Sequence, residues 1–322
     1  MRRTLLVPLA MLVALLAACG TTEPSAPEPG QAAAGGPVTV TDARGKQVTL
    51  QAPATRVVGL EWNVVEHAVS LGVMPVGAAD VEGYGKWVTA EPLDASVRDV
   101  GVRGEPSIDT IASLRPDLIL ATDELPGSAV QQMERFAPVV FVKGGDAKDG
   151  LGQMRRNLDI VATTLGKQAE AATLLSEMDA TIERGRTALA ARAGQPFLFA
   201  DGYLEGSQVS IRPFANGSML SDVTTRLGMR NAWTEPGDGV YGLGQSDVEG
   251  LTRVGDATFL YIANDRDGGD PFATALAGNA VWKSLPFVKS GNVHRLPDGI
   301  WMFGGPTSVQ RYVDAVVGTL RT

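Results

Sequence analysis

The sequence predicts an α/β fold of two lobes, each with a mainly parallel sheet flanked by helices, joined by one long interlobe helix. Strand-like and helix-like segments alternate in both halves of the chain, which is typical of parallel sheets. The 322 residues exceed the usual size of one domain. Between the halves, residues 167–192 carry apolar side chains at helical spacing, and such a helix would span roughly 39 Å. Two lobes on a rigid helix would enclose a cleft.

The first 18 residues have the features of a lipoprotein signal peptide. A basic start, Met1–Arg3, precedes the apolar segment Leu5–Ala17, which is too short to span a bilayer. Small residues then lead to Cys19, the only cysteine of the chain. We therefore expect cleavage before Cys19, a lipid on its sulfur, and an extracytoplasmic protein anchored to the cell membrane. The alternative is an ordinary secretory signal followed by an unrelated cysteine.

Residues 19–37 are rich in proline, glycine and alanine and have almost no larger apolar side chain. Such a segment cannot bury a core, so we expect a lipidated, flexible tether. The whole chain has a formal charge of −8, and loss of Arg2 and Arg3 with the signal peptide makes it more negative. A chain this acidic is a poor candidate for nucleic-acid binding.

The N-terminal lobe is expected over residues 38–145. Alternating apolar and polar residues around an Asp-Ala-Arg-Gly turn predict a hairpin over Val38–Leu50. After it, apolar runs and helical periodicity alternate. The predicted strands are 56–60, 73–76, 118–121 and 139–142, and the predicted helices are 61–71 and 127–136.

A helical connector is expected over residues 146–194. It has a first helix over 150–165, ended by Gly166, and then the long helix, with Gly194 just beyond its end. The C-terminal lobe, 195–322, repeats the alternation of strands and helices. Its predicted strands are 196–200, 206–211, 258–262 and 293–296, and its predicted helices are 218–227, 247–254, 281–285 and 306–321.

The N-terminal lobe has four candidate ligand-binding residues. Trp62 follows a strand end, where α/β folds bind ligands. Tyr84 and Trp87 lie in what reads as a glycine-flanked loop, and Arg103 stands in the turn Gly-Val-Arg-Gly-Glu-Pro. Aromatic walls and a permanently charged guanidinium would suit a compact ligand with anionic oxygens. The alternatives are core packing for the aromatic residues and a plain surface position for the arginine.

The C-terminal lobe offers a second aromatic set. Trp233 and Tyr241 flank a glycine-rich loop, and Trp301 and Phe303 precede a glycine pair. We interpret these four as the opposite wall of the cleft, with core packing as the alternative for Phe303. Trp282, in contrast, is expected in the core.

Enzymatic machinery is not evident in the sequence. The two histidines, His67 and His294, are isolated, and no nucleophile-elbow, penicillin-binding or phosphate-loop motif occurs. The acidic stretch from Asp265 to Asp270 lacks the spacing and the glutamate of a calcium loop. We therefore expect a binding protein without a resident metal or cofactor, with a surface hydrolase as the alternative from another class.

A family resemblance covers the chain from about Arg56 to its C-terminus. Two runs carry it, RVVGLEWNVVEHAVSLGVMPVGAADVEGYGKWV and RDVGVRGEPSIDTIASLRPDLILATDE. They resemble the periplasmic siderophore-binding proteins of ABC importers, most of all the ferric-hydroxamate (ferrichrome-type) and ferric-citrate binders. The resemblance implies the helical-backbone fold of those proteins and a monomer. It also implies delivery of a ferric siderophore, of the hydroxamate type, to a permease and its ATPase.

Roles for single residues follow from the same resemblance. Arg103 would contact the siderophore, which holds the iron itself, and the aromatic residues would line the cleft. Asp109 and Glu249 stand at corresponding places in the two lobes, where family members dock onto permease arginines; the alternative for both is an acid favoured at a helix start. Ferric citrate, haem and cobalamin remain alternative ligands on the same architecture.

The chain departs from the family pattern in two places. Asp123 and Glu124 follow a strand after which hydroxamate binders carry a pocket tyrosine, and Phe303 stands where a tyrosine is frequent. Both changes put an identical ligand in doubt. The added acid would favour a cationic siderophore such as a ferrioxamine.

Overall fold

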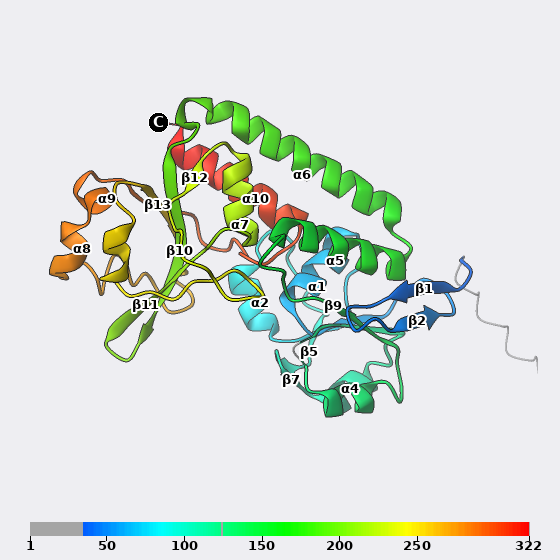
Figure 1. The fold of residues 1–322 in the computed structure, drawn as a ribbon. Helices are drawn as coiled ribbons and strands as arrows, with labels where there is room; N and C mark the ends of the chain where they lie inside the picture. The colour runs from blue at the N-terminus through cyan, green and yellow to red at the C-terminus, as the bar shows by residue number, and fades with distance from the viewer. Residues whose placement is uncertain (1–34, 124, 322) are drawn as a thin grey trace, which may run out of the picture. The chain divides into compact units, whose positions relative to one another are not determined.

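The computed structural model describes residues 35–123 and 125–321. The predicted signal peptide, Cys19 and most of the predicted tether lie outside these residues. Within them, no helix is long and apolar enough to cross a membrane. Two separate five-stranded sheets are present, as the two-lobe prediction requires (Figure 1). The last strand of the first sheet ends at Val142 and the second sheet begins at Pro196, with two helices between them.

The first sheet is entirely parallel, with strand order β5-β4-β3-β8-β9. It is buried on both faces, which explains the continuous apolar runs of its strands. One face, with Val57 and Leu118, packs under α1 and the later helix α5 (Gly150–Leu165), and the other, with Val58 and Ile119, packs on α3 and α4. The elements before the connector are β1 (Val38–Thr41), β2 (Gln47–Leu50), β3 (Val57–Gly59), α1 (Trp62–Ser70), β4 (Gly77–Ala78), α2 (Val81–Trp87), β5 (Arg98–Asp99), β6 (Gly101–Val102), β7 (Glu105–Pro106), α3 (Ile108–Ser113), β8 (Leu118–Thr122), α4 (Gly127–Met133) and β9 (Val139–Val142).

The second sheet is mixed. Strand β10 pairs with β13 and β12 in parallel and with β11 as an antiparallel hairpin, and β14 follows β13. Phe199 and Leu260 face a core with α7 and α10, whereas Phe259 faces Trp282 and Phe287 on the other side, so Trp282 is a packing residue as predicted. The elements are β10 (Pro196–Glu205), β11 (Gln208–Pro213), α7 (Met219–Arg226), β12 (Arg230–Asn231), η2 (Gly250–Arg253), β13 (Thr258–Ile262), α8 (Ala280–Ser284), α9 (Pro286–Lys289), β14 (Val293–Arg295) and α10 (Pro306–Leu320).

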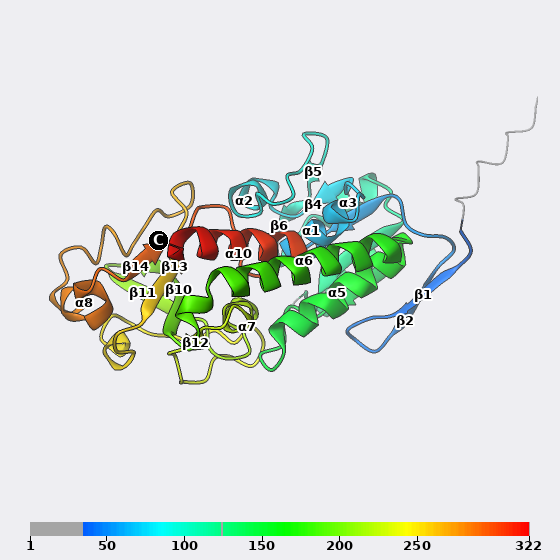
Figure 2. The ribbon, with the colours of Figure 1, turned by 90° about the horizontal axis from the view of Figure 1, so that it is seen from above.

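The two helices of the connector join the lobes. The predicted long helix is α6 (Gln168–Ala188), followed by the short turn η1 (Ala190–Arg192). Its Ala171 is buried in the core of the first sheet, whereas Met178 and Ile182 are buried in the core of the second. Helix α5 (Gly150–Leu165) also contributes to both cores, and Figure 2 shows α5, α6 and α10 side by side.

A buried carboxylate ties the first lobe to the last helix. Glu66 of α1 is fully buried and accepts hydrogen bonds from the Thr307 hydroxyl (2.9 Å), the Ser308 backbone N–H (3.0 Å) and the Ser308 hydroxyl (2.9 Å). These donors belong to the first turn of α10, where backbone N–H groups lack partners within the helix. Gly304 has to be a glycine because a Cβ there would lie 2.3 Å from Oε2 of Glu66.

Three local predictions were wrong. The strand expected at 73–76 is instead β4 at Gly77–Ala78, directly after the predicted range, since Pro75 has no N–H for a strand ladder. The loop expected around Tyr84 is helix α2, which the Asp80 side chain caps by accepting from the Gly83 N–H at 3.1 Å. The helix expected over 247–254 is only the short turn η2.

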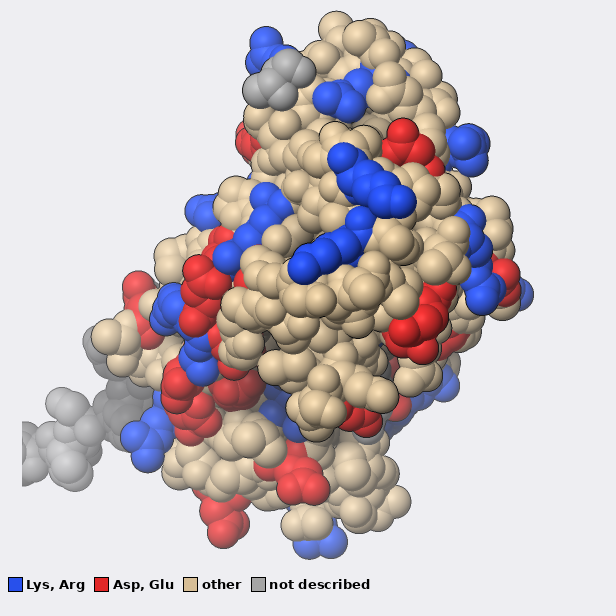
Figure 3. Space-filling model, turned by 90° about the vertical axis from the view of Figure 1, so that its left-hand side faces the viewer, with Lys and Arg blue, Asp and Glu red and all other residues tan. Residues whose placement is uncertain are grey.

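Charged residues of both signs mix on the face of the second lobe that Figure 3 shows. No single-sign field dominates this face, although the chain as a whole is acidic.

The pH dependence of stability should reveal the buried Glu66. Burial raises its pKa above the ordinary 4.5, although its hydrogen bonds to Ser308 and Thr307 oppose the shift. The folded state therefore holds the proton more tightly than the unfolded state, so ionisation of Glu66 costs stability as pH rises from about 4.5 through the folded pKa. Glu66→Gln cannot ionise. Urea denaturation at matched pH values should show the unfolding free energy of the wild type, relative to Glu66→Gln, falling as pH rises. An unfolding free energy of the wild type that rises with pH relative to that of Glu66→Gln would contradict this role of Glu66.

Candidate functional site

A pocket of about 340 Å³ lies between the two lobes. Its walls come from the start of α1, the end of α2 and the β6–β7 turn on one side. The second lobe contributes strands β10 and β11, the loop after β13 and the segment before α10. The lining residues are Glu61, Trp62, Asn63, Trp87, Arg103, Asp201, Arg212, Tyr241, Leu243, Asp267, Trp301, Met302 and Phe303.

Arg103 is held over the aromatic floor of this pocket. It stands in the tight β6–β7 turn, where Gly101 and Gly104 have positive φ values. Its guanidinium carbon lies 3.8 Å from the ring centre of Trp62 and 5.7 Å from that of Trp301, as in cation–π pairs. Nη1 donates to the Glu61 carboxylate at 2.9 Å. Nε of Arg103 also lies 3.9 Å from Oδ2 of Asp80. These carboxylates hold the arginine and leave further N–H donors of its planar fork for a ligand.

The aromatic side chains from both lobes form one continuous set. Trp301 packs edge-on against Trp62 at 4.7 Å, against Trp87 at 6.2 Å and against Phe303 at 5.2 Å between ring centres. Tyr241 continues the set, 5.0 Å from Phe303. Trp301, from the segment before α10, thus connects the walls of the two lobes.

A second arginine lines the opposite side of the pocket. Arg212 of β11 makes a two-point ion pair with Asp201 of β10, where Nε donates to Oδ1 at 2.9 Å and Nη2 to Oδ2. Asp201 is buried, and burial raises the pKa of its carboxyl against the lowering effect of Arg212. Both guanidinium groups in the pocket are therefore paired with carboxylates.

Six of the eight predicted ligand residues line this pocket, and two do not. Tyr84 is fully buried, and its hydroxyl donates to the backbone carbonyl of Glu91 at 2.7 Å, since it belongs to helix α2 rather than to a loop. Trp233 lies in the core of the second lobe beside a different surface groove. The structure therefore does not place these two residues in the interlobe pocket. The six in the pocket are Trp62, Trp87, Arg103, Tyr241, Trp301 and Phe303.

The acid expected near the pocket comes from other residues. Asp123 accepts from the Gly144 N–H at 3.0 Å and lines a separate groove with Arg44 and Phe141, and Glu124 lies outside the described residues. The carboxylates that do line the pocket are Glu61, Asp201 and Asp267. Sequence reasoning missed them, although Glu61 and Asp201 each follow an apolar strand run, a signal that could have found them.

Metal-binding clusters of three or more acidic, histidine or cysteine side chains are absent from residues 35–123 and 125–321. His67 is buried beside Gly305, and burial lowers its pKa to about 4, so it is a neutral structural residue at physiological pH. In the second lobe, Nε2 of His294 lies 3.0 Å from Oδ1 of Asn292.

Comparison with known proteins identifies the family. A sequence model described as "Periplasmic binding protein" matches residues 57–299, most of the chain. The chain belongs to the periplasmic binding protein family. The match spans both lobes and the two helices between them.

Relatives within this periplasmic binding protein family agree with the two-lobe fold. The iron(3+)-hydroxamate-binding protein FhuD of Escherichia coli is 27% identical over 258 residues, which cover 80% of this chain and 84% of the relative. The "Probable siderophore-binding lipoprotein YfiY" of Bacillus subtilis is 24% identical over 317 residues, covering 94% and 93%. The crystal structure of FhuD from Vibrio cholerae bound to Fe3+–Desferal superposes with a TM-score of 0.74, at 26% identity, over 83% of this chain and 98% of that one.

Proposed function

We propose that this protein is the substrate-binding component of an ABC importer, which captures a ferric siderophore of the hydroxamate type in the interlobe pocket. The observation that carries the proposal is Arg103, stacked on Trp62 and Trp301 and held by Glu61 at the pocket wall. The ligand class is supported by the relative named as an iron(3+)-hydroxamate-binding protein and by the FhuD structure bound to Fe3+–Desferal. The protein would act by binding and release, without a chemical step.

The proposed fit follows from the shape and chemistry of a ferric hydroxamate. Three hydroxamates fill the coordination sphere of the iron with oxygens, so the complex brings its metal and presents partly anionic oxygens on an otherwise apolar body. Aromatic faces would contact that body, and free N–H groups of Arg103 would donate to the oxygens. The pocket volume is within the usual range for sites of small ligands.

The charge of the pocket favours hydroxamates over anionic chelates. Three carboxylates and two arginines line it, and both arginines already have carboxylate partners. A ferric trihydroxamate is neutral, or cationic when the siderophore carries an amine, so it would not require unpaired positive charge. Ferric citrate would bring negative charge next to Glu61 and Asp201. The expected preference for a cationic siderophore therefore rests on the carboxylates that line the pocket and no longer on Asp123.

Loss of Arg103 should weaken ligand binding. In Arg103→Ala we expect the affinity for ferrioxamine to fall about 10- to 100-fold, the effect of losing charge-assisted hydrogen bonds. The measurement is quenching of tryptophan fluorescence in the purified chain begun after residue 34, with ferrioxamine, ferrichrome and ferric citrate as ligands. Unchanged ferrioxamine affinity in Arg103→Ala would overturn the role of this residue.

Two control variants sharpen that titration. Arg135→Ala removes an exposed arginine of the same lobe that does not line the pocket, so its affinity should equal that of the wild type. Tyr84→Phe removes a hydroxyl that is bonded inside the protein, so it should cost about 1 kcal/mol of stability and leave affinity unchanged. Absence of saturable quenching by any of the three iron complexes would contradict the proposed ligand class itself.

We further propose that Asp109 and Glu249 dock onto arginines of the permease. Both side chains are exposed, Asp109 in the first turn of α3 and Glu249 at the start of η2. Charge reversal of both to lysine should strongly reduce uptake of radioactive iron by cells while siderophore affinity in solution stays the same. Normal uptake by the double variant would exclude this docking.

We also propose that a lipid on Cys19 anchors the protein outside the cytoplasm. The lipoprotein named among the relatives supports this, whereas Cys19 itself lies outside the described residues. In Cys19→Ala, detergent phase separation of cell extracts should move the protein from the detergent phase to the aqueous phase. A variant that still partitions with detergent would contradict the anchor.

A further inference from the structure

The acidic stretch from Asp265 to Asp270, which lacks the spacing of a calcium loop, lies in a loop of the second lobe that contacts the first lobe. Residues 264–267 of the second lobe contact the end of helix α2 in the first lobe. The Asn264 amide donates to the carbonyl of Lys86 at 2.9 Å, and Arg266 Nη1 donates to the carbonyl of Gly85 at 3.2 Å. The last carbonyls of a helix have no partner within the helix, so the 264–267 loop caps α2 from across the cleft.

The same loop holds a pocket side chain. The indole N–H of Trp87 donates to Oδ2 of Asp267 at 2.8 Å, and Oδ1 of Asp267 lies 3.7 Å from the Lys86 ammonium. Trp87 is half-buried and lines the pocket 6.2 Å from Trp301. Its indole orientation is therefore set by a carboxylate of the opposite lobe.

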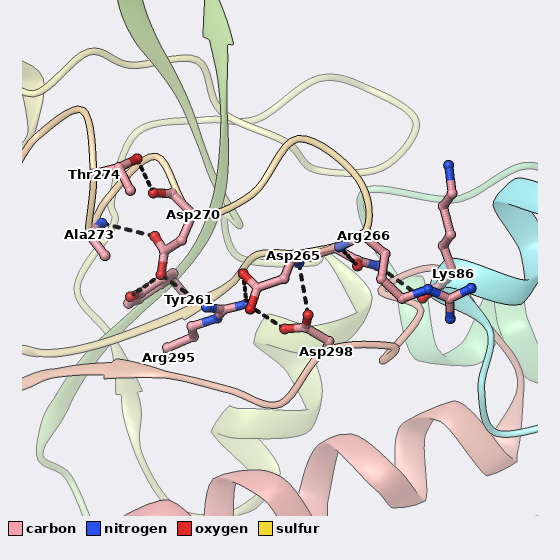
Figure 4. A network of polar contacts seen from close by, with 10 residues as sticks. Lys86, Tyr261, Asp265, Arg266, Asp270, Ala273, Thr274, Arg295 and Asp298 are labelled. Carbon is pink, nitrogen blue, oxygen red and sulfur yellow. Dashed lines mark hydrogen bonds and ion pairs between the residues drawn. The ribbon is translucent and has the colours of Figure 1, made fainter.

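The loop is itself held by a network of polar contacts, which Figure 4 shows. The guanidinium of Arg295 bonds to Asp265 at 2.8 Å and to Asp298 at 2.6 Å, and lies 3.5 Å from Asp270. Asp298 also accepts from the backbone N–H of Asp265 at 2.8 Å. Asp270 in turn accepts from the Tyr261 hydroxyl at 2.9 Å. Each aspartate of the stretch thus has a defined partner in the protein.

A neighbouring segment extends the contact beyond the end of α2. The carbonyl of Gly299, next to Asp298, accepts from the Thr89 N–H at 3.2 Å and from the Thr89 hydroxyl at 2.8 Å. Gly299 has a φ of +78°, and a Cβ there would lie 2.4 Å from Thr89 Cγ2. Two segments of the second lobe therefore hold residues 85–89 on one side of the cleft.

We propose that Asp267 is a positioning residue for ligand binding: it holds the Trp87 indole in the pocket wall, and with the 264–267 loop it keeps α2 against the second lobe. This rests on the proposed function, since it concerns the same pocket. The loop prepares the aromatic wall before the ligand arrives, so less freedom is lost on binding. Loss of the Asp267 acceptor would release the indole without removing any group of Trp87.

The first test needs no ligand. The five tryptophans give five indole N–H signals in an NMR spectrum of the 15N-tryptophan-labelled protein, and Trp87→Phe assigns the signal of Trp87. In Asp267→Ala this signal should move upfield and exchange faster with water, while the other four stay in place. Asp267→Asn keeps an acceptor oxygen, so its Trp87 signal should lie close to that of the wild type. A Trp87 signal unchanged in Asp267→Ala would overturn the positioning role.

The second test uses ferrichrome, whose neutral charge removes direct attraction to Asp267. Asp267→Ala should weaken its affinity about five-fold, the size expected for one lost hydrogen bond, and Asp267→Asn should restore it. In a Trp87→Phe background the Asp267→Ala change should have no further effect. An equal loss in that background would mean that Asp267 acts without Trp87 and would overturn the proposal.

Matched controls separate this inference from the proposed function. Asp256→Ala removes an aspartate of the same lobe that bonds to Ser290 and not to α2, and it should leave both the Trp87 signal and the affinity unchanged. If ferrichrome and ferrioxamine fail to bind the wild type while Asp267→Ala still moves the Trp87 signal, the ligand class is wrong and the positioning of Trp87 stands.

Discussion

The placement of the two lobes depends on helices that are shared between two hydrophobic cores. Helices α5 and α6 run in opposite directions, and each is buried at one end in the core of the first sheet and at the other end in the core of the second. Leu158 and Met178 are fully buried in this way. Exposing such a side chain costs about 1.5–3 kcal/mol, so a wide hinge opening that pulled a helix from either core would be expensive. The separation of the pocket walls is therefore coupled to the packing of both cores.

Within that frame, polar contacts set the details of the pocket before any ligand binds. Glu61 fixes Arg103, Asp201 fixes Arg212, and Asp267 fixes Trp87. Each contact pairs a carboxylate with a side chain that faces the pocket. A site arranged in this way loses less side-chain freedom when a ligand binds.

Much of this organisation could be predicted from the sequence. Periodicity and glycine positions predicted α5 to the residue, and they predicted the long helix α6 with its start one residue early and its end four residues late, since the chain turns into η1 after Ala188. Six of the predicted ligand residues line one pocket, and Trp62 among them follows a strand end, where α/β folds bind ligands. The lobe boundaries at residues 145 and 195 remain predictions.

Other features depend on contacts that the sequence does not reveal. Tyr84 was assigned to a loop, but it lies in helix α2. That helix begins because the Asp80 side chain caps it from a backbone conformation with positive φ, which the sequence did not indicate. The partners of Glu66 and Asp267 belong to the other lobe and lie more than 150 residues away in the chain. Glu66 accepts from the start of α10, and Asp267 accepts from the indole of Trp87. Such long-range pairs have no periodic signal.

The most direct test of the account is to locate the iron itself. Crystals of the protein grown with iron-loaded ferrioxamine, measured at the iron absorption edge, give an anomalous peak at the metal position. The account predicts one peak in the interlobe pocket, with the chelate against Trp62 and Trp301 and its oxygens facing Arg103. A peak elsewhere on the protein, with the pocket filled by solvent, would contradict it.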